Sequence, residues 1–211
     1  MATFRIKPEE NIHQSLIDKF FYRTGWLFFR IVYTLFWRLK VDGLENIPKR
    51  GGAIIAANHI SLADPQLIGC TLSRQVFYMA KKELFDIPIF GWILRRVNAF
   101  PVNRNKSDLT AIRIAKKILS RGELLLMFPQ GGRRKNYESE VKEGVGLLSY
   151  MAQVPIIPCC IINSDKMKKF LPLSVIFSKP IPPSDKNRRS VYTESANKVV
   201  EEIENLKKSS L

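Results

Sequence analysis

The 211-residue sequence predicts an α/β protein, with a largely parallel central sheet flanked by helices and a short aromatic-rich helical arm before it. Short apolar runs such as 53–57 indicate strands buried on both faces, and they alternate with amphipathic helical stretches such as 107–119. Large rings and basic side chains crowd into residues 14–40, which indicates the arm. We therefore expect an arm over 1–40 and one α/β domain over 41–211.

The arm is interpreted as a membrane-docking element. Its uninterrupted apolar stretches are shorter than the roughly 20 residues that cross a bilayer. Four basic side chains are interspersed among its rings: Lys19, Arg23, Arg30 and Arg38. We expect two short helices that meet near Gly25, with Trp26 and Trp37 at the acyl boundary of one leaflet and the basic side chains at headgroups. The alternative is a pair of aromatic helices packed on the α/β domain.

The strand over 53–57 leads into a polar turn that holds His59 and Asp64. Asp64 precedes Pro65, so it is expected to be the N-cap of the next helix, with Pro65 at the first helical position. His59 is expected to be exposed at the carboxyl end of the strand, the edge where α/β sheets bind ligands. A carboxylate five positions on can accept from one ring nitrogen and leave the other free to take a proton. Capping of the helix alone would also explain Asp64, so a catalytic pair and a purely structural cap both remain open at this point.

Later segments continue the alternation. Further strands are expected over 76–80, 123–128, 156–162 and 173–177. Further helices are expected over 107–119, 144–152 and 193–208. The inward side of the first of these helices is expected to hold five residues: Leu109, Ile112, Ala115, Ile118 and Leu119. Residues 41–50 are expected to form a linker and a first turn, and 87–97 a helix or loop with an exposed apolar side.

The net charge of +15 predicts attraction to polyanions, either nucleic acid or an anionic membrane surface. The sequence has no recognisable reading helix or aromatic RNA-binding signature, so nucleic acid is not expected as a partner. The three cysteines and two histidines lack metal-ligand spacing, so neither a metal site nor a disulfide framework is expected. Cys159 and Cys160 are expected in the core of a strand, in a reducing, cytoplasmic-side setting.

Four segments in order resemble a known family. They are Asn58-His59-(four residues)-Asp64, Phe-Pro-Val-Asn-Arg at 100–104, Phe-Pro-Gln-Gly-Gly-Arg at 128–133, and Val-Pro-Ile-Ile-Pro at 154–158. They resemble the four blocks of the glycerolipid acyltransferases, the first being the HX4D motif, and are most similar to those of bacterial 1-acylglycerol-3-phosphate acyltransferases. The resemblance covers roughly residues 41–181, and four ordered blocks are far more specific than any single motif.

The resemblance implies an enzyme that transfers a fatty acyl group from acyl-CoA or acyl carrier protein to the free hydroxyl of lysophosphatidate, expected at sn-2. It implies direct transfer without an acyl-enzyme or a cofactor, at the cytoplasmic face of the cell membrane. His59 would be the general base and Asp64 its orienter. Ser61 is expected to stabilise the loop rather than to act as a nucleophile.

The other blocks would bind the substrates. The resemblance assigns the acceptor phosphate to Arg104 and Arg133, because a guanidinium matches phosphate oxygens bidentately. Gln130 would contact the glycerol moiety, and Gly131 and Gly132 would offer backbone N–H groups to the developing oxyanion.

Three positions depart from the family pattern. Gln130 and Gly132 replace the usual Glu and Thr of the third block, and Asn103 replaces the usual Asp of the second. An amide can still hydrogen-bond a glycerol moiety, but it carries no charge. Activity is therefore expected, with acceptor preference open: glycerol 3-phosphate, another lysophospholipid or a lipid-linked sugar are alternatives. A non-catalytic lipid-binding relative and a basic nucleic-acid-binding protein are the alternatives outside enzyme function.

Overall fold

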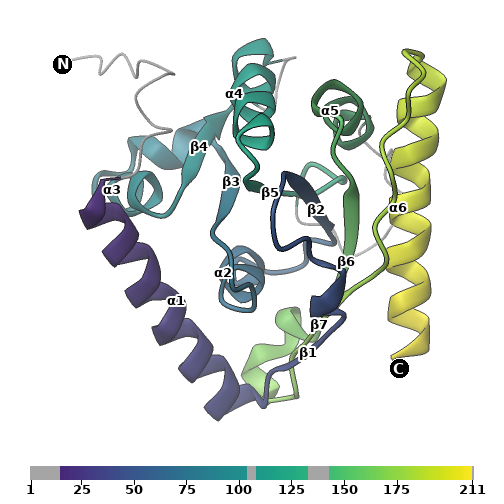
Figure 1. Ribbon diagram of the computed structural model, residues 1–211. Coiled ribbons are helices and arrows are strands. Elements are labelled where there is room, and N and C mark those ends of the chain that lie inside the picture. Colours follow the sequence, from purple (N-terminus) through teal and green to yellow (C-terminus); the bar gives the residue numbers. More distant parts are fainter. Residues whose placement is uncertain (1–14, 104–107, 133–142, 211) are drawn as a thin grey trace.

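A seven-stranded sheet forms the centre of the protein, with strand order β1-β7-β6-β2-β5-β3-β4 (Figure 1). The structure is a computed structural model that describes residues 15–103, 108–132 and 143–210. All neighbouring strands are parallel except β6 and β7, which are antiparallel. Helices flank the sheet, so the predicted fold class is confirmed.

The strands other than β1 and β4 lie close to their predicted positions. Their bounds are β1 (Lys40–Asp42), β2 (Ala53–Ala57), β3 (Val76–Lys81), β4 (Ala99–Val102), β5 (Leu124–Met127), β6 (Ile156–Ile162) and β7 (Ser174–Phe177). Strand β1 was not predicted: it falls at the start of the expected linker, where three residues pair with β7 at the sheet edge. Three residues beside a glycine are too few to show a period of two.

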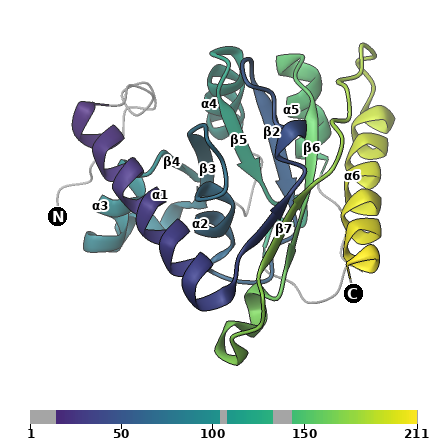
Figure 2. The same cartoon turned by 60° about the horizontal axis from the view of Figure 1, so that its bottom comes forward.

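The helices are α1 (Leu16–Trp37), α2 (Asp64–Gly69), α3 (Pro88–Arg96), α4 (Leu109–Ser120), α5 (Gly144–Ala152) and α6 (Arg189–Ser209). Three short 3₁₀ helices join them: η2 (Leu44–Asn46), η3 (Lys82–Asp86) and η4 (Ser164–Lys169). Two hydrophobic clusters fill the two faces of the sheet. Helices α4, α5 and α6 cover one face, and α1 and α2 cover the other (Figure 2). Alternate residues of β2 enter the two clusters, which explains why all five are buried.

Helix α4 corrects one predicted face. It begins at Leu109, because the Oδ1 atom of Asp108 caps it by accepting from the Ala111 N–H at 3.0 Å. Leu109 is 63% exposed, so the expectation that it faces inward is wrong. It precedes Ala111 by two residues, about 200° around a helix of 3.6 residues per turn. The buried stripe is Ala111, Ile114, Ala115, Ile118 and Leu119.

Helix α1 is one continuous helix of 22 residues, so the expectation of two helices meeting near Gly25 is wrong. A capping box between Ser15 and Asp18 begins it. A single glycine costs a helix only about 1 kcal/mol, which the packing of α1 on the domain outweighs. No helix in the described ranges has the length and apolar character needed to span a bilayer. The division of the chain at residue 40 stays a prediction.

The two faces of α1 differ. The inner face packs on the sheet through Tyr22, Tyr33 and half-buried rings, and the Trp26 and Trp37 indole N–H groups donate to the carbonyls of Leu72 and Met167, both at 2.8 Å. Both tryptophans therefore belong to the interface with the domain, which corrects their placement at the acyl boundary. The outer face is apolar and exposed: Leu16, Ile17, Phe20, Phe21, Leu27, Phe28, Ile31, Leu35 and Phe36. The packed-helix alternative thus holds for one face only.

The three cysteines are free and buried, and Cys159 and Cys160 lie within β6, as predicted for strand core.

Candidate active site

Three neighbouring parallel strands bring the predicted blocks together. Strands β6, β2 and β5 are adjacent in the sheet and run in the same direction. The residues that follow them therefore meet at one edge. His59 follows β2, Phe128 follows β5, and Ser164 follows β6 after one intervening residue.

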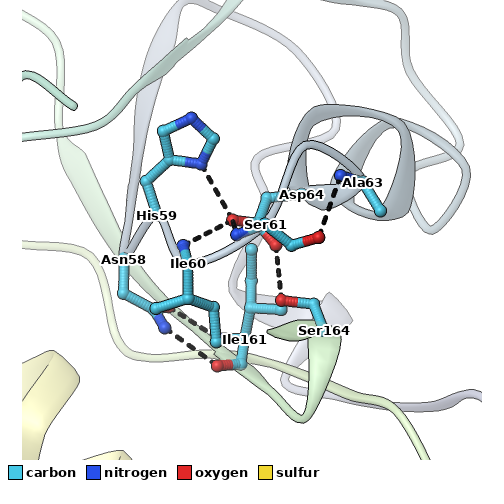
Figure 3. Close-up of polar contacts among 8 residues, drawn as sticks. All are labelled: Asn58, His59, Ile60, Ser61, Ala63, Asp64, Ile161 and Ser164. Atoms are coloured by element: carbon cyan, nitrogen blue, oxygen red, sulfur yellow. Dashed lines mark hydrogen bonds and ion pairs between the residues drawn. The ribbon is translucent and has the colours of Figure 1, made fainter. Parts of the chain in front are cut away.

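His59 and Asp64 form a buried pair at this edge. The Nδ1 atom of His59 lies 2.8 Å from the Oδ2 atom of Asp64. Because a carboxylate only accepts hydrogen bonds, Nδ1 carries the hydrogen, and in the neutral ring Nε2 keeps a lone pair. Figure 3 shows Nε2 on the side of the ring that faces away from Asp64. The geometry of the predicted pair is confirmed, but His59 is only 8% exposed, so the expectation of an exposed loop histidine is wrong.

Asp64 is fully buried and holds the loop that carries His59. Its Oδ2 atom also accepts from the backbone N–H groups of Ile60 at 2.7 Å and Ser61 at 2.8 Å. Its Oδ1 atom accepts from the Ser164 hydroxyl at 2.6 Å (Figure 3). Helix α2 has Ala63 as its N-cap and Asp64 as its first residue, and no side chain caps it. The N-cap expectation for Asp64 is therefore wrong, because its carboxylate is used by the loop and by η4.

Two neighbouring side chains fix the same loop. Asn58 extends the pairing of β2 with β6 beyond the strand end: its amide donates to the Ile161 carbonyl at 2.8 Å and accepts from the Ile161 N–H at 2.7 Å. The Ser61 hydroxyl accepts from the Ala63 N–H at 3.2 Å, as expected of a residue that stabilises the loop. The backbone on both sides of His59 is thus held by side chains.

The third block follows β5 and reaches the histidine. The ring of Phe128 stacks on His59, with centroids 4.0 Å apart and planes 16° apart. Gln130 is buried, at 6% exposed. The Gly131 N–H donates to the Phe128 carbonyl at 2.9 Å in a turn whose φ of 68° favours glycine. The expectation that both glycines offer N–H groups is therefore corrected for Gly131, while Gly132 has no hydrogen-bond partner in the part of the chain that the structure describes.

The predicted phosphate-binding arginines, Arg104 and Arg133, both lie outside the described residues. Lys81, which the sequence reasoning passed over, is the last residue of β3 and lies at the same sheet edge as the histidine. It is exposed and 3.5 Å from Glu83. A basic residue at the end of a predicted parallel strand is the sequence signal that could have identified Lys81 as a candidate substrate-binding residue. Within the described ranges, no group of three or more His, Cys, Asp and Glu side chains is arranged to hold a metal ion.

The fold and the histidine oriented by Asp64 at the carboxyl ends of the strands agree with a known protein family. Residues 38–162, more than half of the chain, match the family model described as Acyltransferase, so the chain belongs to the acyltransferase family. The resemblance in the four blocks is thereby confirmed.

Individual relatives are more specific. A Bacillus subtilis protein named 1-acyl-sn-glycerol-3-phosphate acyltransferase is 30% identical over 186 residues, which cover 83% of this chain and 93% of the relative. A Streptococcus pneumoniae protein of the same name is 32% identical over 165 residues, covering 74% and 61%. The crystal structure of the 1-acyl-sn-glycerophosphate acyltransferase PlsC from Thermotoga maritima matches with a TM-score of 0.70 and 25% identity, covering 90% of this chain and 82% of that one.

Proposed function

We propose that this acyltransferase acylates lysophosphatidate, at sn-2, from an acyl-CoA or acyl carrier protein thioester and so forms phosphatidate. The observation that carries the proposal is the His59–Asp64 pair, in which one ring nitrogen is fixed at 2.8 Å and the other is turned away from the carboxylate. Relatives that cover most of this chain and bear the name 1-acyl-sn-glycerol-3-phosphate acyltransferase support the choice of substrate.

The proposed chemistry needs one base. Nε2 of His59 takes the proton of the acceptor hydroxyl while its oxygen attacks the thioester carbonyl. A new C–O bond forms, the C–S bond breaks, and the leaving thiolate takes the proton from the imidazolium. Asp64 stabilises that imidazolium and keeps the ring oriented. Ser61 supports its loop and has no covalent role in this proposal, so the proposed transfer is direct, without an acyl-enzyme.

The acceptor and the oxyanion are assigned to the neighbouring strand ends. Arg104 and Arg133 are proposed to bind the phosphate, with Lys81 at the rim of the same edge. The Gly132 N–H is proposed to stabilise the oxyanion, and the Gln130 amide to contact the glycerol moiety.

The lipid substrates are proposed to be met at an anionic, cytoplasmic membrane surface. The exposed outer face of α1 continues into α3, where Phe21 and Trp92 meet edge to face at 5.4 Å. The Arg96 guanidinium covers both rings, at 5.7 and 5.0 Å from their centroids. Rings and cations together suit the headgroup boundary of a leaflet. Helix α6, of similar length, exposes Glu194, Lys198 and Glu201 instead, as a helix facing water should.

The test is a panel assay of the full-length protein. Lysophosphatidate, glycerol 3-phosphate and other lysophospholipids would be offered as acceptors, each with acyl-CoA and with acyl carrier protein as donor. We expect turnover of lysophosphatidate above the other acceptors, and its loss in His59→Gln, which keeps a polar side chain of similar size. Preference for glycerol 3-phosphate would make the protein a sibling acyltransferase. Equal turnover by His59→Gln and the parent protein would show that His59 is not the general base. Absence of turnover with every pair of acceptor and donor would favour a non-catalytic lipid-binding protein.

A further inference from the structure

A second exposed apolar and basic surface lies at the end of η4. We define the η4 tip as Lys166, Lys168, Lys169, Phe170 and Leu171, all of which are exposed. Phe170 is 56% and Leu171 36% exposed. The three lysines form no salt bridge with any described residue. The tip therefore presents two large apolar side chains surrounded by unpaired positive charge.

The tip is held in a backbone conformation that an aromatic residue rarely adopts. Phe170 has φ 50° and ψ 29°, in the left-handed region, where a β-carbon is crowded. Its ring stacks on Trp37 with centroids 5.5 Å apart and planes 12° apart. The Arg38 guanidinium donates to its carbonyl at 3.3 Å, and the Asn163 amide donates to the Pro172 carbonyl at 2.9 Å. The stack and the Arg38 hydrogen bond join the tip to the end of α1, and the Asn163 hydrogen bond holds the two ends of the η4 segment together.

The tip extends the outer face of α1. Leu35 and Phe36, in the last turn of α1, are 71% and 58% exposed. Figure 1 shows η4 beside this end of α1, with α3 beside the other end. The last turn of α1 contains no basic residue and Arg38 follows it as the C-cap, so the lysines of the tip add to the positive charge at this end of the surface.

We propose that the η4 tip is a second membrane-contacting element, with Phe170 and Leu171 at the acyl boundary and the three lysines on anionic headgroups. One exposed ring and one exposed leucine among lysines match an anionic bilayer, which takes up both the apolar area and the charge. The inference deepens the proposed function, because it rests on the lipid surface as the source of the acceptor. In this proposal the two ends of η4 have different partners. Ser164, its first residue, hydrogen-bonds Asp64, and the opposite end contacts lipid.

Site-specific labelling tests the contact. The native cysteines are all buried, so an environment-sensitive nitrobenzoxadiazole probe can be placed on single added cysteines. We would compare Leu171→Cys, Phe28→Cys on the outer face of α1, and Lys117→Cys on α4, which covers the opposite face of the sheet. With vesicles of phosphatidylcholine and phosphatidylglycerol, probes at 171 and 28 should shift to the blue and be quenched by spin-labelled lipid, and the probe at 117 should not.

The outcomes separate the two proposals. A probe that enters lipid at 28 but stays in water at 171 would overturn the η4 contact and leave docking by α1 standing. Water at both positions would overturn docking as well. Neither outcome would touch the acyl transfer itself, which the assay with a short, water-soluble lysophosphatidate measures independently.

A charge-matched pair of variants tests the lysines. K166Q/K168Q/K169Q and the control K116Q/K117Q/K198Q, on α4 and α6, each remove three positive charges. At about fivefold per lysine near an anionic surface, the tip variant should bind phosphatidylglycerol-containing vesicles about a hundredfold more weakly. The control should change far less, and binding to pure phosphatidylcholine should stay the same. Equal losses in both variants, or lost turnover of the soluble acceptor in the tip variant, would overturn the proposal.

Discussion

Asp64 and Arg74 are charged side chains that organise opposite edges of the same sheet. At the carboxyl edge, Asp64 accepts from two backbone N–H groups, from His59 and from Ser164. At the amino edge, Arg74 donates to the carbonyl oxygens of Pro48 at 2.7 Å, Gly51 at 2.9 Å and Gly122. These carbonyls belong to the turns that lead into β2 and β5, so one guanidinium ties the starts of two strands together.

The two clusters differ in whether they contain, within the described ranges, a ring nitrogen without a hydrogen-bond partner. The hydrogen bonds of Arg74 all end on main-chain carbonyls, and this cluster only holds backbone. The cluster of Asp64 includes a titratable ring whose second nitrogen has no hydrogen-bond partner among the described residues. A charged cluster at the end of the strands is therefore not by itself an active site. An active site also needs an oriented atom, such as Nε2 of His59, that is free to react with a substrate. Substitutions at the two edges should separate loss of chemistry from loss of stability.

The largest effect is expected for His59→Ala. Loss of the base should lower kcat/KM for a soluble lysophosphatidate by about a thousandfold. The variant should also lose about 1–2 kcal/mol of unfolding free energy, because the stack on Phe128 and a buried hydrogen bond disappear. Kinetics and urea unfolding on one preparation measure both effects. Ser61→Ala is the control and should retain turnover; a dead Ser61→Ala enzyme would restore Ser61 as a nucleophile.

A smaller loss is expected for Asp64→Asn. The amide keeps one oxygen acceptor for the loop, but it replaces the second with an NH2 donor and loses the charge that stabilises the imidazolium, so kcat should fall about a hundredfold. KM for the acceptor should change little, because Asp64 is buried behind His59 and is not expected to touch substrate. Steady-state kinetics decide the matter. A loss confined to KM would show that Asp64 acts in binding.

At the other edge, Arg74→Ala should cost stability and spare the chemistry. Three carbonyls lose a charged donor, and the unfolding free energy should fall by about 2–3 kcal/mol. Turnover per folded molecule should match the parent protein. Denaturant unfolding and an active-site-independent measure of the folded fraction provide the comparison. If kcat collapsed in folded Arg74→Ala protein, the contrast between the two edges would be lost.

The smallest effect is expected for Ser164→Ala. Asp64 would keep three of its four hydrogen bonds, so kcat should fall about fivefold with KM unchanged. Stability should fall by about 1 kcal/mol, since a buried carboxylate oxygen loses its donor. A pure stability loss with an unchanged kcat would limit Ser164 to a structural role.

Local pattern predicted much of this molecule. The bounds of β2, β6 and α5 match the sequence prediction, because strands buried on both faces and a short apolar helix can be recognised from a few residues. The His59–Asp64 pair was predictable for the same reason, as its members lie five residues apart. Ser164 and the Asn58–Ile161 pair were missed, because their partners lie 100 and 103 residues away and meet only through the sheet order.

Helix α1 shows where composition misled. The membrane-docking prediction places its rings on one outward face, yet Tyr22 and Tyr33 are buried and both of its tryptophans hydrogen-bond to the domain. Apolar residues on both faces hide the period that would tell inside from outside. Deleting residues 1–40 would therefore uncover the core, since the Tyr22 hydroxyl accepts from the Val76 N–H at 3.1 Å, and point substitutions on the outer face are the cleaner test.

The buried cysteines bear on whether the thioester donor could acylate the proposed enzyme itself. Thiolates exchange with thioesters, and a protein that handles acyl thioesters risks acylating itself. Burial disfavours the charged sulfur, raising the pKa of Cys70 to about 12 and that of Cys160 to about 11, and the pKa of Cys159 is also raised. At neutral pH, about one Cys160 side chain in ten thousand would be ionised, and none of the three thiols lies at the surface. The acyl group thus meets no competing sulfur nucleophile on the protein.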